Sequence, residues 1–165
     1  HMRTTGMKRA LTGAAIAALA FNASAAEAAT TTATAKARIL APLTIANTSD
    51  LDFGTIVSGT GASTVAVSSA GAVSCGTGLT CLGTTSSANF NLGGTSGANV
   101  TISVPGSVNL TSGANSMTAT LAASNASLTL GASGGSFQVG GTLSVGANQA
   151  AGSYTGTFTV TANYQ

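Results

Sequence analysis

Residues 152–165 read Gly-Ser-Tyr-Thr-Gly-Thr-Phe-Thr-Val-Thr-Ala-Asn-Tyr-Gln, a stretch in which apolar and polar side chains alternate almost without a break. Side chains alternate between the two faces of a β-strand, so this pattern predicts a strand with one buried face and one exposed face. We also expect that an edge of this strand without a neighbour is open to another chain. The predicted buried face carries Tyr154, Gly156, Phe158, Val160, Ala162 and Tyr164.

The composition of the whole chain also indicates an all-β protein. Charged residues make up only 5% of the 165 residues, whereas apolar residues make up 44%. Disordered segments combine low hydrophobicity with high net charge, so this composition argues for a folded chain. The sequence is rich in Thr, Ser, Val and Gly, which favours strands joined by turns over helices.

Residues 1–28 have the parts of a secretory signal peptide, after a His1-Met2 pair that resembles a cloning remnant. A basic start at Lys8 and Arg9 precedes an apolar run from Ala10 to Phe21, and two small-x-small cleavage sequences follow. The run is shorter than the ~20 residues that a membrane-spanning helix needs. We therefore expect an exported protein that passes through the periplasm to the cell surface.

Beyond this predicted signal peptide the charged side chains are Lys36, Arg38, Asp50 and Asp52, which sum to zero. A neutral body offers no electrostatic attraction to nucleic acid or to an anionic membrane. Asp50 and Asp52 share a parity, so they form either a paired-carboxylate or calcium site or a pair of strand-edge acids beside Lys36 or Arg38. We favour the second interpretation because no Asp-x-Asp-x-Asp-Gly loop is present.

The sequence offers little for catalysis. With His1 set aside, no histidine remains to act as a general base, and two acids on one short stretch are a thin basis for acid–base chemistry. We expect that the protein is not an enzyme, and that it holds no catalytic site, no metal and no cofactor.

Residues 29–39 form the second predicted unit of the chain. Lys36 and Arg38 fall on one parity of this segment, and small apolar side chains fall on the other. As an ordinary edge strand the segment is weak, because alanine buries little area. Two interpretations remain, a disordered N-terminus or a detachable strand that adds to the sheet edge of another subunit. The apolar parity consists of Ala33, Ala35, Ala37 and Ile39.

Residues 40–165 are predicted to form one β-sandwich domain, because turn sequences separate short strands at the usual spacing. Pro42 favours an edge position near the start of this domain. In the segment 51–57 we expect Leu51, Phe53 and Val57 to face inward, with Gly54 permitting a bend. The other predicted strands are Thr64–Ser69, Ala88–Leu92, Asn99–Val104, Met117–Ala122, Ser127–Leu130, Ser136–Val139, Thr142–Val145 and Ser153–Tyr164.

Cys75 and Cys81 are the only cysteines. In an exported protein two cysteines this close predict one local disulfide. A metal or redox pair is the alternative, but the spacing is Cys-x5-Cys and the sequence supplies no further ligand nearby.

Gly152, the fourteenth residue from the end, and the penultimate Tyr164, joined by an alternating strand, resemble the C-terminal motif of chaperone–usher pilus subunits. The run Asp50-Leu-Asp-Phe-Gly-Thr-Ile56 is similar to fimbrial and spore-coat-U-like secreted domains. The resemblance implies an immunoglobulin-like sandwich without its final strand, completed first by a periplasmic chaperone and then by the N-terminal strand of an incoming subunit at an outer-membrane usher. The donor residues are then Ala33, Ala35, Ala37 and Ile39, and the acceptor and chaperone-recognition residues are Gly152, Tyr154, Gly156, Phe158, Val160, Ala162 and Tyr164.

The resemblance thus implies a structural subunit of a surface pilus, a head-to-tail polymer of identical or related subunits. The Cys75–Cys81 spacing departs from the long-range disulfide of the best-known pilins, and the donor side chains are smaller than usual. The alternative is a monomeric or self-complemented secreted adhesin or glycan-binding domain. Such sites usually display aromatic rings, and Phe90 and Phe137 are the two rings left available for this role.

Overall fold

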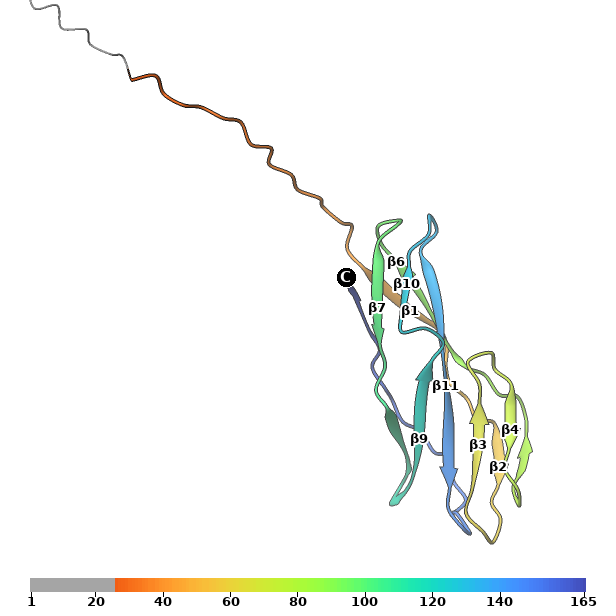
Figure 1. Cartoon of the computed structure of the whole chain (residues 1–165). Helices are drawn as coiled ribbons and strands as arrows, with labels where there is room; N and C mark the ends of the chain where they lie inside the picture. The colour runs from red at the N-terminus through yellow and green to blue at the C-terminus, as the bar shows by residue number, and fades with distance from the viewer. Residues whose placement is uncertain (1–25) are drawn as a thin grey trace, which may run out of the picture. The chain divides into compact units, whose positions relative to one another are not determined.

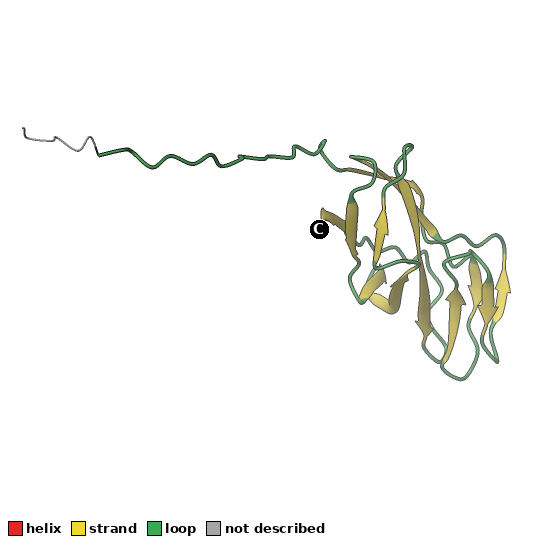
Figure 2. Ribbon diagram, turned by 45° about the horizontal axis from the view of Figure 1, so that its top comes forward, coloured by secondary structure: helices red, strands yellow, loops and turns green. Residues whose placement is uncertain are grey.

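The computed structural model describes residues 26–165, and all regular secondary structure in this part of the chain is β (Figures 1 and 2). The predicted all-β class is therefore confirmed. The chain divides into two units, His1–Ala37 and Arg38–Gln165, which are described separately. Most of the predicted signal peptide lies in residues 1–25, outside the described residues. None of the described segments is a helix that could cross a membrane.

The described residues 26–37 of the first unit form no strand and are exposed. The second unit holds all the strands of the described chain. These are β1 (Thr44–Ser49), β2 (Thr55–Val57), β3 (Ser63–Val67), β4 (Val73–Cys75), β5 (Thr80–Leu82), β6 (Ala88–Gly93), β7 (Asn99–Ser103), β8 (Ser107–Ser112), β9 (Asn115–Ala123), β10 (Ser127–Thr129), β11 (Gly135–Val145) and β12 (Thr161–Tyr164).

The long strand β11 organises the larger sheet, as Figure 1 shows. Along one edge, Gly135–Val139 pairs with β6 and Gly141–Val145 pairs with β3. Along the other edge, Val139–Leu143 pairs with β9. The order β1-β6-β11-β3-β4 follows, with β8 joined to β9, and every pair is antiparallel.

A smaller antiparallel sheet, β10-β7-β12, shares one hydrophobic core with β6 and the first half of β11. In this core the rings of Phe90 and Phe137 stack with their centroids 5.1 Å apart. A second core lies on the part of the larger sheet formed by β3, β9 and the second half of β11, and Phe53 belongs to it. Two sheets that bury alternate residues against each other make a sandwich-like domain.

Gly140 and Gly141 lie inside β11, although the sequence predicted two strands, Ser136–Val139 and Thr142–Val145, with these glycines between them. At this point the strand exchanges β6 for β3 along one edge, and the backbones approach closely. A Cβ at Gly140 would lie 2.5 Å from the carbonyl oxygen of Val67, and one at Gly141 would lie 2.8 Å from that of Thr120. The glycines therefore allow a crossing of strands rather than a turn.

The inward assignment of Val57 was wrong. Leu51 and Phe53 pack in the core as predicted, but Val57 is 53% exposed and Ile56 packs inward in its place. Gly54 has a φ of 74°, which bends the chain and shifts the alternation by one residue. No strand was predicted from the sequence at β1, β4, β5 or β8.

Candidate functional site

The last fourteen residues follow two strands in turn rather than forming one regular strand. Thr155 exchanges two backbone hydrogen bonds with Thr111 of β8, at 2.9 and 3.1 Å. Six positions later β12 begins, and Thr161 pairs with Ser103 of β7. The predicted strand Ser153–Tyr164 is therefore regular only over Thr161–Tyr164. Its two partners, β7 and β8, are separate strands joined by residues 104–106.

Gly152 and Gly156 let this stretch lie against β8. A Cβ at Gly156 would overlap the carbonyl oxygen of Asn109, and a Cβ at Gly152 would overlap the hydroxyl oxygen of Ser112. Gly156 is therefore required by the close approach of two backbones, whereas at Gly152 the contact is with a side chain that can rotate.

The alternation predicted for the stretch is visible in its burial. The apolar parity is half-buried, while Ser153 and the Thr and Asn side chains between its members are exposed. Phe158 contacts the core, where its ring meets Phe90 edge to face at a centroid distance of 6.5 Å. We call this half-buried set the C-terminal apolar row; it consists of Tyr154, Phe158, Val160, Ala162 and Tyr164.

Half-burial sets this row apart from the neighbouring strand β7. Val100 and Ile102 of β7 face the same core and are 0% and 8% exposed. β12 is the last strand of its sheet, so within the described chain nothing pairs with its outer edge. The row therefore has neighbours on the β7 side and solvent on the other.

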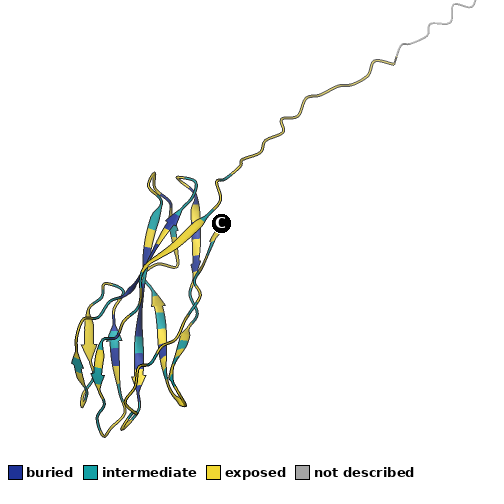
Figure 3. Ribbon diagram, turned by 180° about the vertical axis from the view of Figure 1, so that it is seen from behind, coloured by how far each residue is buried: buried dark blue, intermediate teal, exposed yellow. Residues whose placement is uncertain are grey.

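The edge strand β1 shows the same feature in the other sheet. Ile45 pairs with Leu92 of β6, so both side chains point to the core face, yet Leu92 is 3% exposed and Ile45 is 41% exposed. Figure 3 shows β1 as an exposed strand. The apolar faces of both edge strands, β1 and β12, are thus incompletely covered.

β1 and the C-terminal stretch lie on the same side of the sandwich and run in opposite directions. At one end the hydroxyl of Tyr164 donates a hydrogen bond to the carbonyl oxygen of Ala41, just before β1. Further along, Asn47 of β1 pairs with Phe90, whose ring meets Phe158. We call this side, between β1 and the C-terminal apolar row, the open side of the sandwich.

The predicted donor residues lie in the segment before β1. Ala33, Ala35 and Ala37 are exposed, and Ile39 is 92% exposed. This segment has no regular strand, contrary to the strand pattern of its sequence. A strand of small side chains gains stability only from a partner edge, since its own burial is slight.

The predicted disulfide between Cys75 and Cys81 is confirmed, and it ties β4 to β5. Asp50 and Asp52 are both exposed, and one carboxylate oxygen of Asp52 accepts a hydrogen bond from the backbone N–H of Gly54 at 2.8 Å. Among the described residues, no three His, Cys, Asp or Glu side chains gather as they would around a metal ion.

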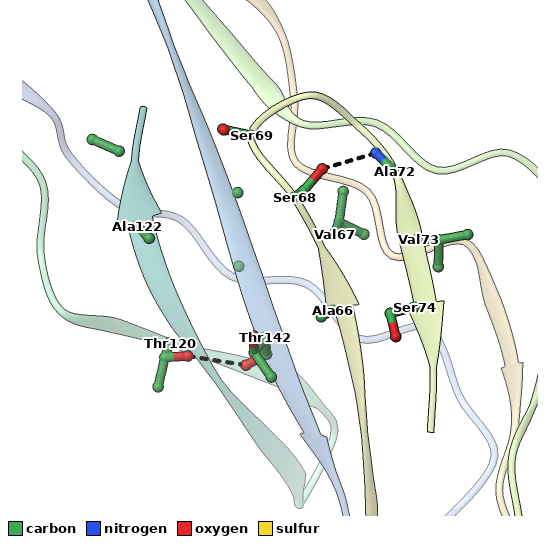
Figure 4. A pocket seen from close by; sticks show the side chains of 13 residues that line it. Ala66, Val67, Ser68, Ser69, Ala72, Val73, Ser74, Thr120, Ala122 and Thr142 are labelled. Atoms are coloured by element: carbon green, nitrogen blue, oxygen red, sulfur yellow. Dashed lines mark hydrogen bonds between the residues drawn. The ribbon is translucent and has the colours of Figure 1, made fainter. Parts of the chain in front are cut away.

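A hollow of about 430 Å³ lies over β3, β4, β9 and β11 (Figure 4). Its lining consists of small side chains, and its hydrogen bonds, such as that from the Thr120 hydroxyl to the carbonyl oxygen of Thr142, serve the sheet itself. Phe90 and Phe137 line no surface, because they are only 7% and 0% exposed. The suggestion that these two rings face solvent as ligand contacts was therefore wrong.

A family model described as Domain of unknown function (DUF4402) matches residues 43–164, and the chain belongs to this family. The match includes every strand from β1 to β12 and leaves out the segment that carries the predicted donor residues. Among curated proteins, none matches the chain.

Proposed function

We propose that this member of the DUF4402 family is a structural subunit of a bacterial surface filament that assembles by donor-strand exchange. The acceptor is the open side of the sandwich, and the donor is the segment 29–39 of the next copy. In transit a periplasmic chaperone covers the open side, and an outer-membrane usher brings the copies together. The protein is exported and ends in an extracellular filament.

The observation that carries this proposal is the exposure of Ile45 beside the buried Leu92. Both side chains face the core, so a fully covered sandwich would bury both. An added strand between β1 and the C-terminal apolar row would cover Ile45 and bury the remainder of the row. Main-chain hydrogen bonds to an unpaired edge would supply further attachment, as in other cases of β-strand addition.

The small side chains of the segment 29–39 suit the open side of the sandwich, because that side is already partly filled. Phe158 and Tyr164 occupy part of the open side, and alanine side chains add little volume to it. Ala33, Ala35, Ala37 and Ile39 would point inward, and Lys36 and Arg38 would stay in water. Because donor and acceptor are different surfaces of one chain, the contact is head-to-tail, and it generates a filament when successive copies do not rotate into a closed ring.

The experiment removes Thr30–Arg38 from the full chain and expresses it beside its chaperone and usher. We expect the variant to fold and to accept a strand but not to donate one, so negative-stain microscopy of sheared surface protein should show no filaments. Filaments as abundant as those of the intact chain would contradict the proposal and favour a monomeric or differently assembled surface domain.

Two point variants test whether the inward face of the segment 29–39 is needed for assembly, or only the presence of the segment. Ala35→Asp places a carboxylate on the inward parity and should block filaments, since an unpaired buried charge is costly. Thr34→Asp adds the same charge on the outward parity and should leave assembly largely intact. Equal loss of filaments in the two variants would mean that the segment does not dock as a strand with one buried face.

A further inference from the structure

The charged side chains of the chain beyond residue 28 lie on two short segments. Lys36 and Arg38 are on the segment before β1, and Asp50 and Asp52 follow β1 directly. From Phe53 to Gln165 the sequence contains no Asp, Glu, Lys, Arg or His. Any electrostatic attraction between copies of this chain therefore acts chiefly through these two segments.

Asp50 and Asp52 are held on the outside of the sandwich at the end of β1. Both are exposed, whereas Leu51 between them is half-buried and Phe53 after them is buried. The backbone of Asp52 exchanges hydrogen bonds with Ser86 at 2.9 and 3.1 Å, which fixes this stretch in an extended form. The two carboxylates thus lie on the exposed side of the stretch after β1, opposite Leu51 and Phe53, and an irregularity in register between Asn47 and Ser49 separates them from the regular part of β1.

We infer that Lys36 and Arg38 of one copy pair with Asp50 and Asp52 of the next, and that these pairs set the direction and register of the docked segment. The inference rests on the proposed function. Both pairs of charges are two residues apart, a spacing of about 6.6 Å on extended chains. Both also lie on the outward parity of their segments, so side-by-side strands would present them to each other.

The pairing selects one direction for the docked segment. With Lys36 beside Asp50 and Arg38 beside Asp52, in a strand parallel to β1, residues 29–35 lie along residues 43–49. On the inward parity, Ala29 and Thr31 then lie beside the half-buried Leu43 and the exposed Ile45, and Ala33 lies beside Asn47. In the reverse direction Lys36 would lie beside Asp52 and Arg38 beside Asp50. Residues 29–35 would then lie along residues 53–59, beyond the end of β1 and away from Leu43 and Ile45.

A strand parallel to β1 is antiparallel to the C-terminal stretch, because those two run in opposite directions. Exposed ion pairs add little affinity, so their main effect is on which alignment is chosen. A slip by one residue would turn Lys36 and Arg38 toward the core and lose both pairs. The ion pairs thereby select one register of the donor segment, because its alanine side chains alone do not distinguish one register from another.

The test uses charge reversal in the full chain. Lys36→Glu with Arg38→Glu places acids beside acids, and we expect the concentration needed for half-maximal assembly to rise about tenfold at low salt. Asp50→Lys with Asp52→Lys should do the same by placing cations beside cations. Combining all four changes restores opposite charges, and assembly should return to within about threefold of the original chain. In 1 M salt the Debye length is about 3 Å, so the differences in assembly between these variants and the original chain should largely disappear.

Asp52→Lys also removes the hydrogen bond to Gly54, so a second set avoids that residue. Lys36→Asp alone and Asp50→Lys alone should each weaken assembly, and the double variant should recover it. Circular dichroism of each variant checks its fold.

The outcomes separate this inference from the proposed function. If deletion of Thr30–Arg38 abolishes filaments but no charge reversal weakens them, or the combined variants fail to recover, the ion pairs are refuted and donor-strand assembly stands. If the deletion leaves filaments intact, the proposed function fails and this inference fails with it.

Discussion

The hydroxyl group of Tyr164, in the last strand, donates a hydrogen bond to the backbone carbonyl oxygen of Ala41 at 2.8 Å. The same hydroxyl accepts a hydrogen bond from the backbone N–H of Thr95 at 2.9 Å, and the Thr95 hydroxyl accepts one from the N–H of Ala41 at 2.7 Å. Gly94 lies directly against the Tyr164 hydroxyl, and a Cβ at this position would overlap the hydroxyl oxygen. These contacts fasten the entry of the chain into the domain to its C-terminal strand.

Replacement of Tyr164 by Phe should loosen this junction while the ring stays in place. Two hydrogen bonds are lost, and at about 1 kcal/mol each we expect the free energy of unfolding to fall by about 1–2 kcal/mol. The amide hydrogen of Ala41 should exchange with solvent faster, as followed by NMR. Tyr154→Phe is the control, because its hydroxyl also makes two bonds, to Ala150 and Gln149 in a local loop. If the Ala41 amide hydrogen exchanged at the same rate in Tyr164→Phe as in the original chain, the Tyr164 hydroxyl would not hold Ala41 in place.

Phe158 and Thr159 test the two faces of the C-terminal stretch. Truncation of a fully buried Phe to Ala costs roughly 3–5 kcal/mol, and Phe158 is half-buried against Phe90, so we expect Phe158→Ala to cost about 2 kcal/mol. Thr159 is exposed, and Thr159→Ala should change stability by no more than about 0.5 kcal/mol. Urea denaturation gives both values, and equal losses would show that the faces are assigned wrongly.

Gly156 tests the close approach of the stretch to β8. Its Cβ would meet a backbone atom of Asn109, which cannot rotate away as a side chain can. We expect Gly156→Ala to destabilise the domain by about 1–3 kcal/mol. Gly106→Ala is the matched control, because a Cβ at Gly106 would meet nothing within 4 Å. A Gly156→Ala variant as stable as Gly106→Ala would mean that the two strands lie farther apart.

Alternation along single strands predicted much of the fold. β3, β6, β7 and β9 were placed within a few residues, because each has one buried face and its sequence alternates accordingly. β8 also alternates, with Val108 and Leu110 half-buried, but its Asn, Thr and Ser residues and the turns around it concealed it. Alternation in the sequence identifies a strand only when several large apolar residues lie on its buried face.

The candidate site could be predicted only in part. Its inward parity follows from local sequence, and so does the exposure of Thr159 and Thr161. The path along β8 and then β7 does not, because pairing depends on distant segments. The partner of Tyr164 is 123 residues away, at Ala41, and no local pattern encodes that contact. The exposure of Ile45 likewise depends on the position of β1 at the edge of its sheet, which the sequence of the strand alone does not predict.

Gly140 shows where local chemistry misleads, since a Gly-Gly pair between two apolar runs is a usual turn signal. In the structure Gly140 is buried in the middle of β11, and a Cβ there would lie 2.5–2.7 Å from backbone atoms of Val67, Ser68 and Ser69. Relief would require β3 to move away from β11, which also opens the core around Val67. We expect Gly140→Ala to lower the free energy of unfolding by roughly 3 kcal/mol, near the upper end of overpacking costs.

Gly61→Ala is the control for this change, because its Cβ meets nothing within 4 Å. Replacing such a glycine restricts the unfolded chain, so Gly61→Ala should leave stability unchanged or raise it by up to about 1 kcal/mol. Urea denaturation of the two variants, with the slope compared to confirm similar unfolding, gives the difference. If Gly140 were instead in a turn between two separate strands, alanine there would be tolerated nearly as well as at Gly61. A small loss at Gly140 would therefore overturn the continuous β11 and its exchange of β6 for β3.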